Sequence, residues 1–137
     1  MSSEKSGANR IGEATPDCDY LSVRVLIVDD HPSFRASARK LLESDGFEVV
    51  GEAADGAGAI RVAEELQPDL VLLDVQLPDV DGFEVAEQLT ALEHAPEVIL
   101  TSSRDGSDYG TCVEDSGARG FVPKAELSGA ALSLLLE

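Results

Sequence analysis

The sequence predicts an α/β fold in which a five-stranded parallel sheet is covered by helices on both faces. Five short aliphatic runs alternate along the chain with five segments of helical periodicity, and such alternation is typical of βαβ units with right-handed crossovers. The runs are almost continuously apolar instead of alternating with polar residues, which indicates strands buried on both faces. Together these two observations predict a doubly wound sheet with five helices.

The five strand segments are aliphatic and bounded by polar or turn-forming residues. They read LSVRVLIV, FEVVGEA, DLVLLDV, PEVILTS and RGFVPK, at residues 21–28, 47–53, 69–75, 96–102 and 119–124. Short connections to the helical segments leave no room for extra domains within this stretch.

Three helical segments follow the first three strands, and each has apolar residues at helical spacing. The first carries Phe34, Ala38, Leu41 and Leu42 and ends at Gly46. The second carries Ala59, Ile60, Ala63 and Leu66 after Asp55. The third carries Val85, Leu89 and Leu92 after Asp81 and Gly82. We expect the apolar residues to contact the sheet, with Asp55 and Asp81 as N-caps.

The last two helical segments are less regular. Residues 107–116 offer only Tyr109, Cys112 and Val113 as an apolar group, so we expect a marginal helix that is open to rearrangement. Residues 127–136 are rich in leucine. Their predicted core residues are Leu127, Ala131, Leu134 and Leu135. The remaining two, Leu132 and Leu136, are predicted to form a surface for a partner.

Length, charge and composition exclude several functions. The 137 residues suffice for one domain, and the polar, aperiodic start predicts a flexible tail at 1–20 before a domain at 21–137. The net charge of -17 would repel nucleic-acid phosphates and anionic lipids, so we expect no direct contact with nucleic acid or membrane. Cys18 and Cys112 lie far apart without metal-ligand spacing, and no export signal is visible, so we expect a cytoplasmic protein.

Polar side chains end four of the five strands. They are Asp29 and Asp30, Asp74, Thr101 and Ser102, and Pro123 and Lys124. Because the carboxyl ends of parallel strands share one edge, we expect these residues to converge where such folds bind ligands. Converging carboxylates persist best beside a divalent cation or a lysine. The pattern therefore predicts a Mg²⁺ site, with Lys124 and the Thr101 hydroxyl available for an oxyanion.

Each of these residues taken alone has a simpler explanation. Asp30 followed by Pro32 could cap the next helix, and Lys124 could be a solvated charge. Asp74 is harder to explain as a cap because QLPDVDG separates it from the next helix. The convergence of all of them on one edge favours a functional site.

Four motifs carry a resemblance to a known family. VLIVDDHPS, LVLLDVQLPDVDG, VILTSS and ARGFVPK resemble the receiver domain of two-component response regulators, over about residues 22–136. The acidic pair, acceptor Asp, hydroxyl residue, aromatic residue and lysine occur in the family's order. DDHPSFR and DVQLPDVDG are similar, more narrowly, to receivers that usually precede a helix-turn-helix output domain. The resemblance implies the flavodoxin-like strand order 2-1-3-4-5.

The resemblance also implies an aspartyl-phosphate switch with Asp74 as the phosphoacceptor. A histidine kinase or phosphotransfer protein would supply the phosphoryl group. Mg²⁺ would be bound by Asp29, Asp30, Asp74 and the backbone carbonyl of Gln76, while Lys124 and Thr101 would bind phosphoryl oxygens. The chain would be no conventional enzyme, although it would catalyse its own phosphorylation and dephosphorylation.

Signal output would follow from a switch pair. The resemblance implies that Thr101 moves toward the phosphoryl group and Phe121 turns inward, which reshapes the surface of the fourth helix, fifth strand and fifth helix. A downstream target, an output domain or a second copy of the chain would bind that surface. Gln76, Ser102 and Ser103 would flank the acceptor and tune the phosphoryl lifetime.

Two positions depart from the family pattern. Phe121 replaces the Tyr often found there, so a hydroxyl hydrogen bond is lost to the output. Ala125 follows Lys124 where the family often has Pro after a cis bond, and cis geometry before Ala would cost about 3 kcal/mol. The sequence leaves the isomer of this bond open.

Two other classes of protein need residues that this sequence lacks, and a third class remains open. A haloacid-dehalogenase-like phosphatase needs a second Asp where Gln76 stands, and a flavodoxin-like electron carrier needs a hydroxyl- and Gly-rich loop where DDHPS stands. A pseudo-receiver that binds proteins without phosphorylation remains the alternative, although every ligand is present. The sequence also leaves open whether the receiver acts alone or within a longer regulator.

We expect four further charged or titratable residues at the surface. His31 and His94 are predicted to be polar surface side chains, because a phosphodonor His normally lies on an exposed helix of a bundle. Arg35 and Arg39 lie one turn apart on the first helix. They predict a docking stripe for a kinase or, equally, a solvated face.

Overall fold

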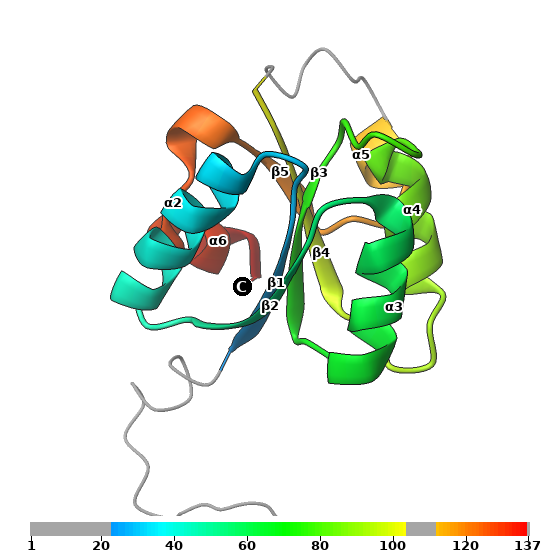
Figure 1. Ribbon diagram of the computed structural model, residues 1–137, viewed down its shortest axis with the longest axis horizontal. Coiled ribbons are helices and arrows are strands. Elements are labelled where there is room, and N and C mark those ends of the chain that lie inside the picture. Colours follow the sequence, from blue (N-terminus) through cyan, green and yellow to red (C-terminus); the bar gives the residue numbers. More distant parts are fainter. Residues whose placement is uncertain (1–22, 104–111, 137) are drawn as a thin grey trace, which may run out of the picture.

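The computed structural model describes residues 23–103 and 112–136, and this part of the chain forms a central sheet between two helical layers (Figure 1). The tail predicted at 1–20 and the first half of the helix predicted at 107–116 lie outside the described residues. In the described part, no helix is both long and apolar enough to cross a membrane.

The sheet has five strands in the order β2-β1-β3-β4-β5, and all neighbouring pairs are parallel. The strands are β1 (Arg24–Val28), β2 (Glu48–Ala53), β3 (Leu70–Asp74), β4 (Glu97–Ser102) and β5 (Gly120–Pro123). Every residue of the central strand β3 is buried, as its continuous apolar run predicted. The predicted fold class and strand order are confirmed.

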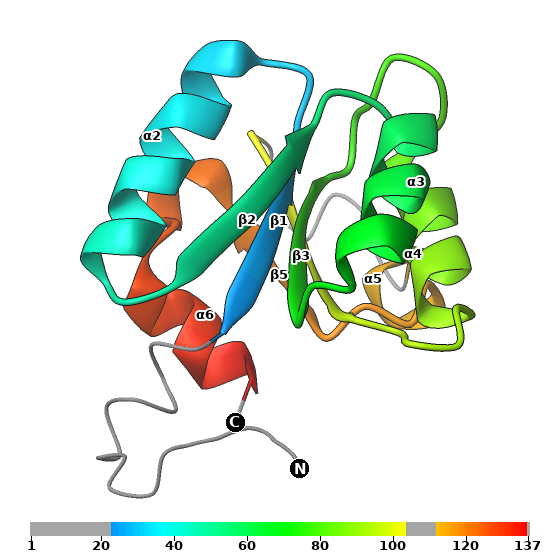
Figure 2. The same ribbon diagram turned by 60° about the horizontal axis from the view of Figure 1, so that its bottom comes forward.

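Helices cover both faces of the sheet (Figures 1 and 2). One face carries α2 (Pro32–Ser44) and α6 (Gly129–Leu136), and the other carries α3 (Gly56–Leu66), α4 (Gly82–Thr90) and α5 (Cys112–Asp115). A short 3₁₀ turn at Lys124–Glu126 joins β5 to α6. Of the five described α-helices, α5 is a single turn of four residues, which agrees with the weak helical pattern there.

The first three helices follow their sequence signals closely. Asp55 and Asp81 each accept a hydrogen bond from the N–H three residues on, so both predicted N-caps are confirmed. In α2, Ala38 and Leu42 are buried as expected. Leu41 is 36% exposed, so its prediction as a core residue is wrong. At about 100° per residue, Leu41 lies about 60° from Ala38, at the edge of the buried stripe.

The face that α6 buries agrees only in part with the predicted one: Leu127, Ala131 and Leu135 pack against the core as expected, but the other three leucines do not follow the prediction. Leu132 is fully buried and Leu134 is 70% exposed, whereas the reverse was predicted. Leu136 is half-buried against the core, so it is not free for a partner either. The helix begins at Gly129, not Leu127, and Gly129 and Leu132 share the buried face. Because almost every residue of this helix is apolar, periodicity alone did not select the face.

Candidate functional site

The carboxyl ends of four strands bring the predicted residues together. Asp74 is the last residue of β3 and is paired in register with Thr101 of β4. Asp29 follows β1 directly, and its backbone N–H donates to the Ala53 carbonyl of β2. Lys124 follows β5. The site therefore lies at one edge of the sheet, as the parallel topology requires.

Lys124 bridges the two buried carboxylates of the site. Its Nζ lies 2.6 Å from Oδ2 of Asp29 and 3.5 Å from Oδ2 of Asp74. Both Asp side chains are at most 4% exposed, and that of Lys124 is 17% exposed. The alternative of a solvated surface lysine is therefore wrong.

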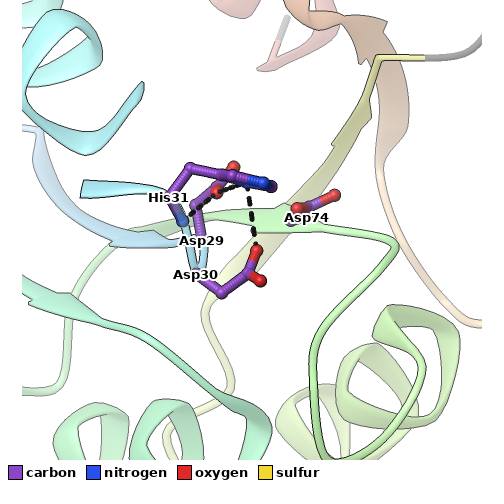
Figure 3. A group of neighbouring side chains, drawn as sticks. All are labelled: Asp29, Asp30, His31 and Asp74. Atoms are coloured by element: carbon purple, nitrogen blue, oxygen red, sulfur yellow. Dashed lines mark hydrogen bonds and ion pairs between the residues drawn. The ribbon is translucent and has the colours of Figure 1, made fainter. Parts of the chain in front are cut away.

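Asp29, Asp30, His31 and Asp74 form one cluster (Figure 3). Each offers a ligand atom, and these atoms all lie within 4.8 Å of one another. The helix-cap alternative for Asp30 is not observed, because no side chain caps α2, whose N-cap is His31.

His31 contributes more to the site than its sequence context suggested. The side chain is 63% exposed, as expected, yet its Nδ1 lies 3.0 Å from Oδ1 of Asp29 and 3.1 Å from Oδ1 of Asp30. Its backbone N–H also donates to Oδ1 of Asp29 at 2.8 Å. The position directly after the acidic pair was the one sequence signal that could have indicated this.

Burial raises the pKa of Asp74 above its ordinary value. The negative charge of Asp29 acts in the same direction, while the Gln76 N–H, at 3.1 Å from Oδ1, and Lys124 oppose the shift. The pKa of this carboxyl is raised because an ion in a buried site loses its hydration. A cation beside Asp74 would favour its ionised form.

Three side-chain oxygens of the site are buried without a hydrogen bond in the described part of the chain. Oγ1 of Thr101 has no partner there although the residue is fully buried. Oδ2 of Asp29 and Oδ1 of Asp30 have only their ion pairs with Lys124 and His31. An unsatisfied buried hydroxyl is costly. The donor set of clustered carboxylate oxygens is the chemistry that Mg²⁺ prefers. The residues present therefore fit a hard divalent cation beside an oxyanion that accepts from Thr101.

The loop after Asp74 folds back against the start of α4. Gln76 and Asp81 form an isolated antiparallel bridge, and Gly82 donates to the Val75 carbonyl at 2.6 Å. A Cβ at Gly82 would lie 2.3 Å from the Asp74 carbonyl oxygen. Only glycine permits this approach, which fixes the loop that carries the Gln76 carbonyl.

A second contact ties the same loop to α3. Asp79 accepts hydrogen bonds from the backbone N–H groups of Gly56 and Ala57, at 2.9 and 3.1 Å. These donors lower the pKa of Asp79, with Gly56 the largest cause. The loop is thus held at both of its ends.

The residues predicted to flank the acceptor or to switch with it differ in burial. Ser102 is buried, while Gln76 and Ser103 are exposed. Phe121 is half-buried against the core under α3 and α4. It also lines a cavity of about 220 Å³ between β5 and α6, to which the exposed Leu134 contributes.

Phe34 is a neighbour of the site that the sequence placed only in the core. The Lys124 ammonium lies 4.5 Å from the centroid of the Phe34 ring, within the range of a cation–π contact.

Among residues 23–103 and 112–136 no peptide bond is cis, so the bond from Lys124 to Ala125 is trans.

The two arginines of α2 are not a solvated stripe. Arg35 and Arg39 both pair with Glu52 of β2, at 3.0 and 2.8 Å. Both guanidinium groups are ion-paired within the molecule, while the Arg39 side chain is still 36% exposed, so a docking role for this part of α2 stays a prediction.

Comparison with known proteins identifies the class to which this fold and site belong. Residues 25–133 match the response regulator receiver domain family. The chain therefore belongs to that family, and the resemblance found in its motifs is confirmed.

Two curated relatives show how similar the chain is to individual transcription regulators. The chain is 41% identical over 103 residues to the transcription regulator BvgA of Bordetella pertussis, covering 75% of this chain and 49% of that protein. It is 36% identical over 104 residues to the DNA-binding transcriptional activator EvgA of Escherichia coli K12, covering 76% and 51%. The chain thus spans about half the length of these relatives.

A solved structure of a response regulator is also similar to this chain in sequence and in fold. The LuxR-family two-component response regulator of Aurantimonas is 34% identical and superimposes with a TM-score of 0.74, covering 82% of this chain and 84% of that one.

Proposed function

We propose that this chain is a phosphoacceptor switch in which Asp74 takes a phosphoryl group, in the presence of Mg²⁺, from a histidine kinase or phosphotransfer protein. The observation that carries the proposal is the environment of Asp74. A buried carboxylate has a lysine ammonium at 3.5 Å, further acidic groups within 4.8 Å and a buried hydroxyl without a partner beside it.

The chemistry follows from these groups. An oxygen of the Asp74 carboxylate attacks phosphorus in line, an O–P bond forms, and the bond from phosphorus to the donor breaks with its electron pair leaving on the donor. Lys124 and the Thr101 hydroxyl bind the oxygens of the transferred group, which carry its charge. Bound Mg²⁺ would neutralise that charge, held by Asp29, Asp30, Asp74 and the Gln76 carbonyl.

Output from the site is proposed to run through Thr101. Its partnerless hydroxyl can turn toward a phosphoryl oxygen, which leaves room for Phe121 to move inward. The surface that would change is built from α5, β5 and α6, the fourth helix, fifth strand and fifth helix of the expected fold. Among the described residues of this surface, Leu134 is the exposed large apolar side chain, in place of Leu132 and Leu136. A downstream target, an output domain or a second copy would bind there.

Intact mass after incubation with acetyl phosphate tests the proposal. We expect one phosphoryl adduct with Mg²⁺, none after chelation and none in Asp74→Asn. A matched control, Asp79→Asn, alters an acidic residue of the same loop whose carboxylate bonds to α3 and not to the site. It should still be phosphorylated. Absence of the adduct in the wild type, together with no binding of beryllofluoride, would favour the pseudo-receiver.

A further inference from the structure

Two arginines on α2 share one acidic partner on the edge strand β2. Nε of Arg35 lies 3.0 Å from Oε1 of Glu52, and Nε of Arg39 lies 2.8 Å from Oε2. The hydrogen bond from Arg39 is the largest cause of the lowered pKa of Glu52. Glu52 therefore stays ionised and fixes both guanidinium groups.

The two arginines differ in what else they contact. Arg35 also donates from Nη1 to the backbone carbonyl of Asp29, at 2.5 Å. Arg39 instead reaches Glu43 and the Val49 carbonyl, both at 3.4 Å and both away from the site. Arg35 is also the less exposed of the two, at 17% against 36%, so water screens its contacts less.

With this bond, all polar groups of Asp29 are engaged. Its N–H donates to Ala53, its carbonyl accepts from Arg35, and its carboxylate contacts His31 and Lys124. The rigid fork of the guanidinium joins the backbone of the acidic pair to the edge strand. A rotation of the Asp29 peptide would move both Asp29 and Asp30.

We propose that Arg35, held by Glu52, is a positioning residue that fixes the backbone of the acidic pair and thereby sets the affinity of the site for Mg²⁺. This inference rests on the proposed function for its metal, and it adds a residue outside the ligand set. The guanidinium would not bind the metal itself. It would orient the residues that do, as groups next to metal ligands commonly do.

The test compares Arg35→Ala with Arg39→Ala, since both remove one partner of Glu52 but only the first removes the bond to Asp29. Calorimetric titration with MgCl₂ should show affinity about 10- to 100-fold weaker for Arg35→Ala. Arg39→Ala should stay within about twofold of the wild type. Equal weakening in both variants, or none in Arg35→Ala, would overturn the proposal.

A second readout needs no metal. In metal-free protein, hydrogen exchange at the His31 N–H reports its bond to the Asp29 carboxylate. Arg35→Ala should lose this protection and Arg39→Ala should retain it. If the wild type binds no Mg²⁺, the proposed function fails while this measurement still decides the role of Arg35.

Folding of the variants is checked by thermal melting. If Arg35→Ala does not fold, Glu52→Gln takes its place, because it weakens the hold on the guanidinium without removing it. This variant should reduce Mg²⁺ affinity and His31 protection in the same direction, by less. Unchanged affinity and protection in Glu52→Gln would contradict the proposal.

Discussion

Replacing Asp74 with Asn should stabilise the metal-free protein at neutral pH. The carboxylate is buried, and its burial is the largest cause of its raised pKa. At an effective dielectric constant of about 20, repulsion from Asp29, whose ligand oxygen lies within 4.8 Å, is at least about 3.5 kcal/mol, and attraction to Lys124 at 3.5 Å is about 5 kcal/mol. These two contributions nearly cancel.

What remains is the cost of desolvating the charge. That cost is several kcal/mol for a buried ion, reduced by the charged hydrogen bond from Gln76, which contributes about 1.5–3 kcal/mol. An Asn side chain keeps an acceptor for that N–H without the ionic desolvation. We therefore expect Asp74→Asn to raise the free energy of unfolding by about 1–2 kcal/mol at pH 7.

The stability that Asp74→Asn gains over the wild type should depend on pH, and the raised pKa sets the direction. A raised pKa means that folded Asp74 binds its proton more tightly than the unfolded chain, whose Asp titrates near 3.8. Wild-type stability from this group is therefore lost as the pH rises from that value through the folded pKa. The difference between variant and wild type should shrink as the pH falls toward 4.

Urea unfolding with and without Mg²⁺ measures this effect. Without metal, the unfolding midpoint of Asp74→Asn should lie above that of the wild type, with an unchanged denaturant slope. Mg²⁺ should stabilise the wild type more than the variant, because it binds the intact site. A variant less stable than the wild type at pH 7, or a difference that does not change with pH, would refute the reasoning.

Three further substitutions test the packing of α6 and of the loop after Asp74. Leu132→Ala should lower the free energy of unfolding by about 2–5 kcal/mol because the side chain is fully buried. Leu134→Ala should leave it nearly unchanged because that side chain is 70% exposed. Chemical denaturation measures both variants, and equal losses would contradict the buried face of α6. Gly82→Ala should lower the free energy of unfolding by more than about 3 kcal/mol, or disturb the loop after Asp74, because its Cβ would lie 2.3 Å from a backbone oxygen. A melting temperature like that of the wild type would show that glycine is not required at this close approach.

The parts of the site that the sequence could predict are those that strand order alone determines. Asp29, Asp74, Thr101 and Lys124 lie at the carboxyl end of a strand or directly after it, and the carboxyl ends of parallel strands share an edge. Their convergence needed no knowledge of side-chain conformations. The resemblance to the receiver family predicted the sheet order, and the Asp residues directly before the periodic apolar segments predicted the caps of α3 and α4.

The missed features depend on contacts between elements distant in the sequence. The bond of Arg35 to Glu52 joins residues 17 positions apart, and the ring of Phe34 meets Lys124 from the other end of the chain. Neither side chain differs in type from an ordinary surface or core residue. The buried face of α6 was missed because its sequence is apolar all round, so only docking on the sheet distinguishes Leu132 from Leu134.

We propose that, among the clustered carboxylates, Asp74 is the one that receives the phosphoryl group. The most direct test is reduction of the phosphorylated protein with borohydride, which converts an acyl-phosphorylated aspartate to homoserine, followed by peptide mass mapping. We expect conversion of Asp74 alone, dependent on Mg²⁺ and on prior exposure to acetyl phosphate. Conversion at Asp29 or Asp30 with Asp74 intact would contradict it.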